Sequence, residues 1–152
     1  SFIENLETSV LPLAQKGRNL FTIKNNSFIT QIYTDQIKLR QILLNLLSNA
    51  CKFTHQGHIE LTLETQTPFL IFHIIDNGRG MSRKSQETLF QPFTQITPTV
   101  ENYANSTGLG LYLSRQLAQR LGGDITLTST LNMGSHFQLR IPLHYSPTTP
   151  TN

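Results

Sequence analysis

The fold is decided by the stretch Asn45-Leu46-Leu47-Ser48-Asn49-Ala50-Cys51-Lys52-Phe53. Apolar residues at the i, i+3, i+4, i+7 spacing of an amphipathic helix run through it and upstream of it, at Leu39, Ile42, Leu43, Leu46, Ala50 and Phe53. Asp35 can cap this helix, and the pattern stops near 55–57. The sequence therefore predicts a long helix with one apolar face.

Working outward, the chain alternates between short helical and strand patterns. Helices are predicted over about 3–17, 82–90 and 108–121, and strands over 20–24, 58–65, 69–76, 124–130 and 135–142. Turn residues join the strands in two hairpins, one at Thr67-Pro68 and one at Asn132-Met133-Gly134. Residues 94–107 show no sustained periodicity, and loops of that length are usually functional lids or disordered. Helices combined with hairpin-linked strands predict a two-layer α+β sandwich.

Composition narrows the class of protein. A length of 152 residues fits one domain, which we place at 1–143, with a polar tail or linker at 144–152. Twelve Lys and Arg against nine Asp and Glu give +3 without a basic run, which argues against a nucleic-acid partner but allows a small polyanion. The single Cys51 excludes an internal disulfide and indicates a reducing compartment, and no apolar run approaches bilayer length. The helical pattern at the first residues suggests a piece of a longer protein.

A polar stripe follows one face of the long helix. Gln41, Asn45, Asn49 and Lys52 are spaced by four, four and three residues. Asn is unfavourable inside a helix, so the stripe is either a solvated face or a set of fixed amide oxygens. Amide oxygens are hard ligands of the kind Mg²⁺ takes together with water and phosphate.

Asp76-Asn77-Gly78-Arg79-Gly80 ends an apolar strand with a carboxylate. One interpretation is an Asx-type turn with glycines for positive φ. The other is a partly buried acceptor for the exocyclic amino group of adenine, with Gly78 and Gly80 letting the backbone approach the ring.

Ser106-Thr107-Gly108-Leu109-Gly110-Leu111 opens the helix that follows the long loop. Glycines at a helix start indicate close backbone approach, and the free N–H groups there favour an anion. Neither the P-loop nor the Rossmann glycine pattern occurs.

In order along the chain, these segments resemble the N, G1, F and G2 boxes of sensor histidine kinases, with Phe90-Gln91-Pro92-Phe93 as the F box and Gly134-Ser135 similar to the final glycine motif. The resemblance covers nearly the whole chain. It implies the catalytic and ATP-binding domain, the Bergerat fold shared with gyrase, heat-shock chaperones and MutL. That fold has a mixed sheet of about five strands on about three helices, with nucleotide under a long ATP lid.

The resemblance also implies roles for single residues. Asn49 is the expected Mg²⁺ ligand, Asn45 contacts the metal through water or phosphate, and Lys52 faces a phosphate. Phe53 packs at the nucleotide, and Asp76 takes the adenine amino group. Gln95 corresponds to a residue that reaches the γ-phosphate. The remaining ATP-binding positions are Gly78, Gly80, Phe90, Phe93, Ser106, Thr107, Gly108, Leu109, Gly110 and Leu111, of which Gly108 and Gly110 cradle phosphates; relatives usually have Gly at the position of Ser106.

The implied function is donation of the ATP γ-phosphoryl group to a histidine. Relatives that hydrolyse ATP place a Glu where this chain has Asn45, because a general base must activate water. None of the five histidines has the acceptor context of a His followed by Glu or Asp on a long helix, so the acceptor is expected on upstream dimerisation helices. The expected partners are those helices and a response regulator or receiver domain. The fragment itself is expected to be monomeric and cytoplasmic, and its parent can be membrane-anchored. The alternative is a degenerate module that serves as an interaction platform.

Overall fold

A computed structural model describes residues 2–27, 34–88 and 110–144 of the chain. Three long helices are α1 (Phe2–Lys16), α2 (Gln36–Phe53) and α5 (Gly110–Arg120), and α3 (Arg83–Thr88) is a short one. The strands are β1 (Leu20–Asn25), β2 (His58–Gln66), β3 (Phe69–Asp76), β4 (Asp124–Thr130) and β5 (Gly134–Pro142). The predicted elements in these ranges are confirmed to within a few residues. The long loop at 94–107 lies outside the described residues, and the domain boundary at 143 stays a prediction.

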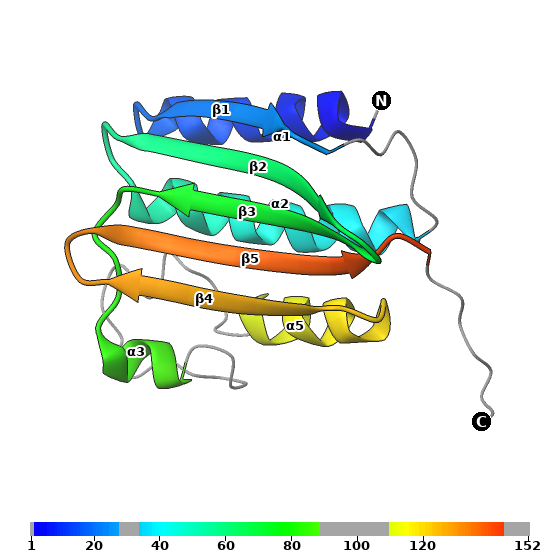
Figure 1. Ribbon diagram of the computed structural model, residues 1–152. Helices are drawn as coiled ribbons and strands as arrows, with labels where there is room; N and C mark the ends of the chain where they lie inside the picture. Colours follow the sequence, from blue (N-terminus) through cyan, green and yellow to red (C-terminus); the bar gives the residue numbers. More distant parts are fainter. Residues whose placement is uncertain (1, 28–33, 89–109, 145–152) are drawn as a thin grey trace.

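The five strands form one mixed sheet in the order β1-β2-β3-β5-β4. β1 runs parallel to β2, whereas the β2–β3, β3–β5 and β4–β5 pairs are antiparallel. Helices α1, α2 and α5 cover one face of the sheet (Figure 1). The parallel pair follows from α2, because a chain that crosses the sheet as a helix returns in the same direction. The prediction of a two-layer α+β sandwich is confirmed.

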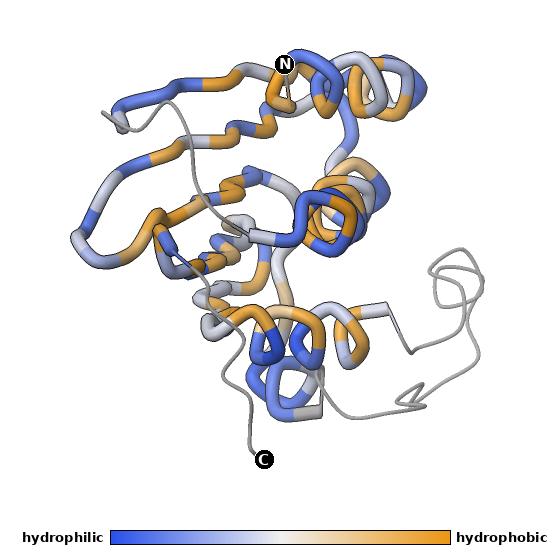
Figure 2. The backbone as a smooth tube through the Cα atoms, turned by 90° about the vertical axis from the view of Figure 1, so that its right-hand side faces the viewer, coloured by the Kyte–Doolittle hydropathy of each residue, from blue (hydrophilic) through white to orange (hydrophobic). Residues whose placement is uncertain are grey.

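The core lies between the helical layer and the sheet, where Figure 2 shows the hydrophobic stretches of both layers facing each other. On α2, Ile42, Leu43, Leu46 and Leu47 are fully buried. Alternate residues of the central strands meet them from the sheet, with Leu61, Phe72, Ile74 and Leu139 at 0–1% exposure. None of the helices in the described ranges combines the length and apolar character needed to cross a membrane.

The start of α2 is fixed by its cap. The Asp35 carboxylate accepts the backbone N–H groups of Ile37 and Lys38 at 3.0 and 3.1 Å, which satisfies two donors that the helix leaves unpaired. Lys38 Nζ lies 2.8 Å from the same carboxylate, and its hydrogen bond holds the pKa of Asp35 below the ordinary value. The cap fixes where α2 begins, and the apolar spacing from Leu39 onward decides which of its residues face the core.

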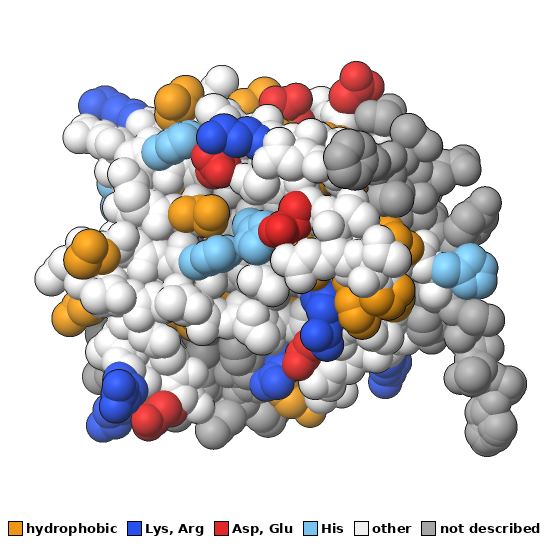
Figure 3. All heavy atoms as spheres, in the orientation of Figure 1, with side chains coloured by type: hydrophobic (Ala, Val, Ile, Leu, Met, Phe, Trp, Pro, Cys, Tyr) orange, Lys and Arg blue, Asp and Glu red, His pale blue; other side chains and the backbone are white. Residues whose placement is uncertain are grey.

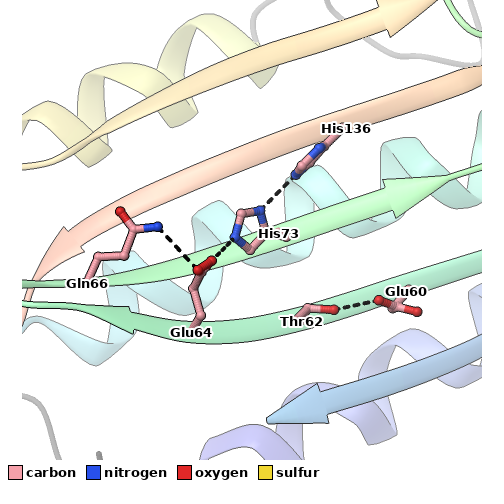
Figure 4. A network of polar contacts seen from close by, with 6 residues as sticks. All are labelled: Glu60, Thr62, Glu64, Gln66, His73 and His136. Carbon is pink, nitrogen blue, oxygen red and sulfur yellow. Dashed lines mark hydrogen bonds and ion pairs between the residues drawn. The ribbon is translucent and has the colours of Figure 1, made fainter. Parts of the chain in front are cut away.

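No helix of the described ranges covers the other face of the sheet, which carries a chain of titratable side chains. Figure 3 shows histidine and acidic side chains gathered over its middle strands. His73 on β3 lies between two partners: its Nδ1 is 2.8 Å from His136 Nε2 on β5, and its Nε2 is 2.9 Å from Glu64 Oε2 on β2 (Figure 4). Because an ionised carboxylate only accepts, His73 donates from Nε2, and one proton occupies the contact between the two rings.

The contacts between Glu64, His73 and His136 predict that the domain loses stability in mild acid. Burial foremost, and then His73, lower the pKa of His136, and the hydrogen bond from His73 lowers the pKa of Glu64. Folding therefore favours the neutral His136 ring, so its stabilisation is present above the ordinary histidine pKa and is lost as pH falls through the lowered value. In urea unfolding at pH 7 and at about pH 5.5, we expect the midpoint of His136→Gln to fall less than that of the parent. The exposed His55 provides the control variant His55→Gln, and equal falls in parent and His136→Gln would contradict the prediction.

Candidate nucleotide-binding site

The polar stripe of α2 meets the first turn of α5. Asn45 donates from Nδ2 to the buried Ser114 Oγ at 2.8 Å, which fixes the direction of its amide. A Cβ added at Gly110 would come within 2.9 Å of Asn45 Oδ1, so α5 begins in close contact with the stripe. The structure thus brings Asn45, Gly110 and the buried Leu111 together, as the sequence analysis expects of one site.

Asn49 and Lys52 continue the stripe toward the C-terminal end of α2. Asn49 is half-buried and Lys52 is exposed, and neither side chain has a hydrogen-bond partner among the described residues. The Asn45 amide is held through its Nδ2, which leaves its Oδ1 facing Gly110, whereas neither atom of the Asn49 amide is engaged by the described part of the chain. Both residues therefore offer an amide oxygen to an incoming group, and only that of Asn45 is fixed in direction.

Asp76 ends β3 as a buried carboxylate, 6% exposed. Its Oδ1 accepts the backbone N–H of Gly78 at 2.9 Å. Burial raises the pKa of Asp76, whereas the backbone N–H groups of Gly78 and Ser135 and the nearby Thr54 hydroxyl act in the opposite direction. The nearby Cys51 thiol has its pKa raised to about 11 by burial and by the charge of Asp76. A buried acceptor of this kind selects a partner that brings its own N–H.

The turn after Asp76 packs against the end of α2. The Arg79 guanidinium lies over the Phe53 ring, 4.7 Å from its centroid. A Cβ at Gly78 would collide with the Phe53 carbonyl oxygen, and one at Gly80, which has φ +66°, would collide with the Thr130 carbonyl oxygen. The close approach that these glycines permit is therefore toward the protein's own backbone; their approach to a base stays a prediction.

The β4–β5 turn supports Asp76 from the other side. Gly134 has φ +109°, and a Cβ there would collide with the Asp76 carbonyl oxygen, so only glycine fits. Ser129 Oγ contacts Ser135 Oγ and the Gly134 carbonyl oxygen at 2.9 Å each, and it accepts the Met81 N–H at 2.9 Å. These contacts join the Asp76 turn to the last two strands.

The described part of the chain places the predicted residues on three elements: Asn45, Asn49, Lys52 and Phe53 on α2, Asp76, Gly78 and Gly80 at and after the end of β3, and Gly110 and Leu111 at the start of α5. Contacts join Asn45 to the start of α5, and Phe53 to the turn after Asp76. The other predicted residues lie outside the described ranges: Phe90, Phe93, Gln95, Ser106, Thr107, Gly108 and Leu109.

Several polar residues that support the site are not among those predicted from the sequence. Asn19 donates from Nδ2 to the Thr54 carbonyl oxygen at 2.7 Å and accepts the Gly57 N–H at 3.0 Å, which ties the turn after α1 to the end of α2. Ser114 and Ser129 orient Asn45 and the Asp76 turn. Thr54 faces Asp76. A serine on the predicted inner face of 108–121 was a usable signal for Ser114, since polar residues on a buried face need partners; the others depend on contacts distant in sequence.

Comparisons with known proteins identify the family of this chain. The family model described as histidine kinase-, DNA gyrase B- and HSP90-like ATPase matches residues 34–145. The chain is 38% identical over 144 residues to the aerobic respiration control sensor protein ArcB of Escherichia coli, covering 93% of this chain and 18% of that protein. It is 35% identical over 133 residues to the autoinducer 2 sensor kinase/phosphatase LuxQ of Vibrio cholerae, covering 85% of this chain and 16% of LuxQ. The chain thus spans less than a fifth of these relatives.

Solved structures show the same architecture. The nucleotide-free catalytic domain of histidine kinase ThkA superposes with a TM-score of 0.80 at 23% identity, covering 94% of this chain and 91% of that one. Full-length ShkA in complex with AMPPNP gives a TM-score of 0.82 at 26% identity, covering 97% of this chain and 30% of that one. The family match and these relatives identify a catalytic, ATP-binding domain of the sensor histidine kinase type. The chain belongs to the histidine kinase-, DNA gyrase B- and HSP90-like ATPase family.

Proposed function

We propose that this domain binds ATP with Mg²⁺ and donates the γ-phosphoryl group to a histidine on dimerisation helices elsewhere in its parent protein. The phosphorylated histidine then supplies a response regulator or receiver domain of a two-component pathway. The matched sensor kinases, which are much longer than this chain, support the presence of such further segments in the parent. The domain works in the cytoplasm and needs no nucleic acid.

The observation that carries the proposal is the amide at position 45, held by Ser114 beside the start of α5. An amide has no basicity with which to take a proton from water, so this position does not favour hydrolysis. Phosphoryl transfer to an imidazole nitrogen depends instead on positioning and on stabilising charge at the phosphates. The polar stripe and the start of α5 offer both.

Each end of the nucleotide has matching residues. The buried Asp76 side chain accepts the adenine amino group, with Phe53 near the same turn. Lys52 and the start of α5, including Gly110 and Leu111, are expected to contact the phosphates. The same role is predicted from the sequence for Gly108 and Gln95, which lie outside the described ranges. In transfer, the acceptor imidazole nitrogen forms a bond to the γ-phosphorus as the bond to the β–γ bridging oxygen breaks, and ADP leaves with that electron pair.

The donors also suit Mg²⁺. Among the described residues, no group of three or more His, Cys, Asp or Glu side chains is placed to hold a metal ion. A single hard oxygen, from the unengaged Asn49 amide, fits an ion that keeps several waters and takes phosphate oxygens. Asn49 would hold it directly and Asn45 through water or phosphate. Bound there, Mg²⁺ neutralises charge on the phosphates.

The test mixes this domain with radiolabelled ATP and a separately prepared dimerisation helix pair from the parent. Acid-labile label is expected on a histidine of the pair, at low efficiency because tethering is lost. The domain alone should bind ATP without labelling itself or hydrolysing it quickly. Label on His55, His58, His73, His136 or His144 would overturn the assignment of the acceptor, and failure to bind ATP would favour a degenerate interaction module.

A further inference from the structure

A buried hydroxyl lies beside Asp76 without a hydrogen bond of its own. Thr54 directly follows α2 and is 1% exposed. Within the part of the chain that the structure describes, three buried side-chain oxygens have no hydrogen-bond partner, namely the hydroxyls of Thr34, Thr54 and Thr65. Leaving a buried hydroxyl unpaired costs free energy, so its place in a binding site calls for a reason.

The direction of this hydroxyl is set by two glycines. A Cβ at Gly57 would lie 2.7 Å from the Thr54 methyl carbon, whereas one at Gly78 would lie 2.7 Å from Thr54 Oγ1 and 3.0 Å from Asp76 Oδ1. The methyl group thus points toward Gly57, and the hydroxyl and the carboxylate converge at Gly78 with no side chain between them. Asn19 holds the backbone of Thr54 through its 2.7 Å hydrogen bond to the carbonyl oxygen.

Hydrogen-bond donors around Asp76 favour its ionised form. Burial raises the pKa of Asp76. Two backbone N–H groups, of Gly78 and Ser135, and the Thr54 side chain lower it. The Thr54 hydroxyl is close enough to lower the pKa of Asp76, although it does not reach ordinary hydrogen-bond geometry. From α2, Cys51 also faces Asp76, but with a pKa of about 11 it does not titrate where a carboxylate does. His136 on β5 contacts His73 on the uncovered face of the sheet instead.

We propose that Thr54 is a positioning residue for the base, whose hydroxyl holds the Asp76 carboxylate in the orientation that accepts the exocyclic amino group of adenine. The inference rests on the proposed function, in which Asp76 reads adenine. A bound base excludes water from the carboxylate, and in that less polar setting a donor beside it matters more. The hydroxyl is then paired in the complex, which accounts for its unpaired state in the free domain.

Three variants separate the hydroxyl from its volume and from general effects. Thr54→Val keeps the shape and removes the donor, and Thr54→Ser keeps the donor. Thr65→Val removes another buried, unpartnered threonine hydroxyl on β2, where residue 65 pairs with Leu70 at the other end of β3 from Asp76. ADP binding without Mg²⁺ is measured by titration calorimetry from about pH 5 to pH 8, a range that covers a carboxylate whose pKa is raised by burial.

We expect Thr54→Val to bind ADP roughly three- to tenfold more weakly at pH 7, the loss of about one hydrogen bond. As the pH is lowered, Thr54→Val should lose ADP binding at a higher pH than the parent does, because removal of the donor raises the pKa of Asp76 further. Thr54→Ser and Thr65→Val should follow the parent. Unchanged binding by Thr54→Val at every pH would overturn the inference and leave the proposed function standing, as would a loss equal at every pH, which indicates packing alone. A parent that binds no ADP overturns both.

Discussion

Replacing Asp76 by Asn is expected to weaken ADP binding roughly ten- to a hundredfold, since a hydrogen bond to a charged group contributes about 1.5–3 kcal/mol. The substituted amide turns an acceptor into a group that can present its own N–H₂ to the adenine amino group. Discrimination against GDP should narrow as well. Titration calorimetry with both nucleotides measures the two effects, and a variant that binds ADP as tightly as the parent would refute base recognition by Asp76.

The same substitution should not destabilise the free domain. The pKa of Asp76 is raised by burial, so folding favours the protonated form. For an acid with a raised pKa, this contribution to stability is present at low pH and is lost as pH rises through the folded value. At neutral pH the ionised carboxylate therefore costs stability, and we expect the urea midpoint of Asp76→Asn at pH 7 to equal or exceed that of the parent.

Asp124 offers the matched control, because its pKa is shifted in the opposite direction from that of Asp76. Although burial acts to raise it, the pKa of Asp124 is lowered by Arg115, whose Nε lies 2.9 Å from Oδ1. Asp124→Asn should therefore leave ADP binding unchanged and lower stability by about 0.2–1 kcal/mol, as is usual for a solvent-accessible ion pair. Ionised Asp124 thus stabilises the fold, whereas ionised Asp76 lowers its stability. Binding of a ligand is therefore the reason we infer for the presence of Asp76.

The sequence predicted the fold well where several signals coincide. At α2 the cap at Asp35 and the apolar periodicity from Leu39 onward indicate the same helix. At β2 and β3 two apolar strands flank a short turn, and the register of the hairpin follows from the turn. The same holds for β4 and β5. In each case the information lies within about twenty residues of chain, where periodicity and turn chemistry determine structure.

The remainder depends on contacts between distant segments. Asn19 and Thr54 are 35 residues apart, and His73 and His136 are 63 apart. The first pair meets because β1 lies beside β2, and the second because β3 pairs with β5 in a particular register. For Gly78 and Gly80 the sequence left open a turn with positive φ and a close approach to a bound ring; Gly80 has φ +66°, and the closest neighbours of both glycines are the chain's own carbonyl groups. A composition pattern indicates that backbone approaches something closely but does not identify the partner.

Replacing Asn49 by Ala is expected to remove most of the gain that Mg²⁺ gives to ATP binding. The amide of Asn49 lacks a partner in the described ranges, so the substitution deletes an oxygen without breaking an internal hydrogen bond, and Ala favours the helix. Binding of ADP without Mg²⁺ should stay within about twofold of the parent, while the Mg²⁺-dependent increase should drop roughly tenfold or more.

Two further variants serve as controls for the Asn49→Ala experiment. Gln41→Ala lies on the same stripe two turns earlier and is exposed, so it should leave both measurements unchanged. Asn49→Asp keeps a hard oxygen at the position, and it should restore much of the Mg²⁺ dependence if ligation is the role of Asn49. Titrations of ATP and ADP with and without Mg²⁺ across the four proteins decide the matter. Equal losses with and without the metal in Asn49→Ala would show that this residue shapes the nucleotide site without touching the ion.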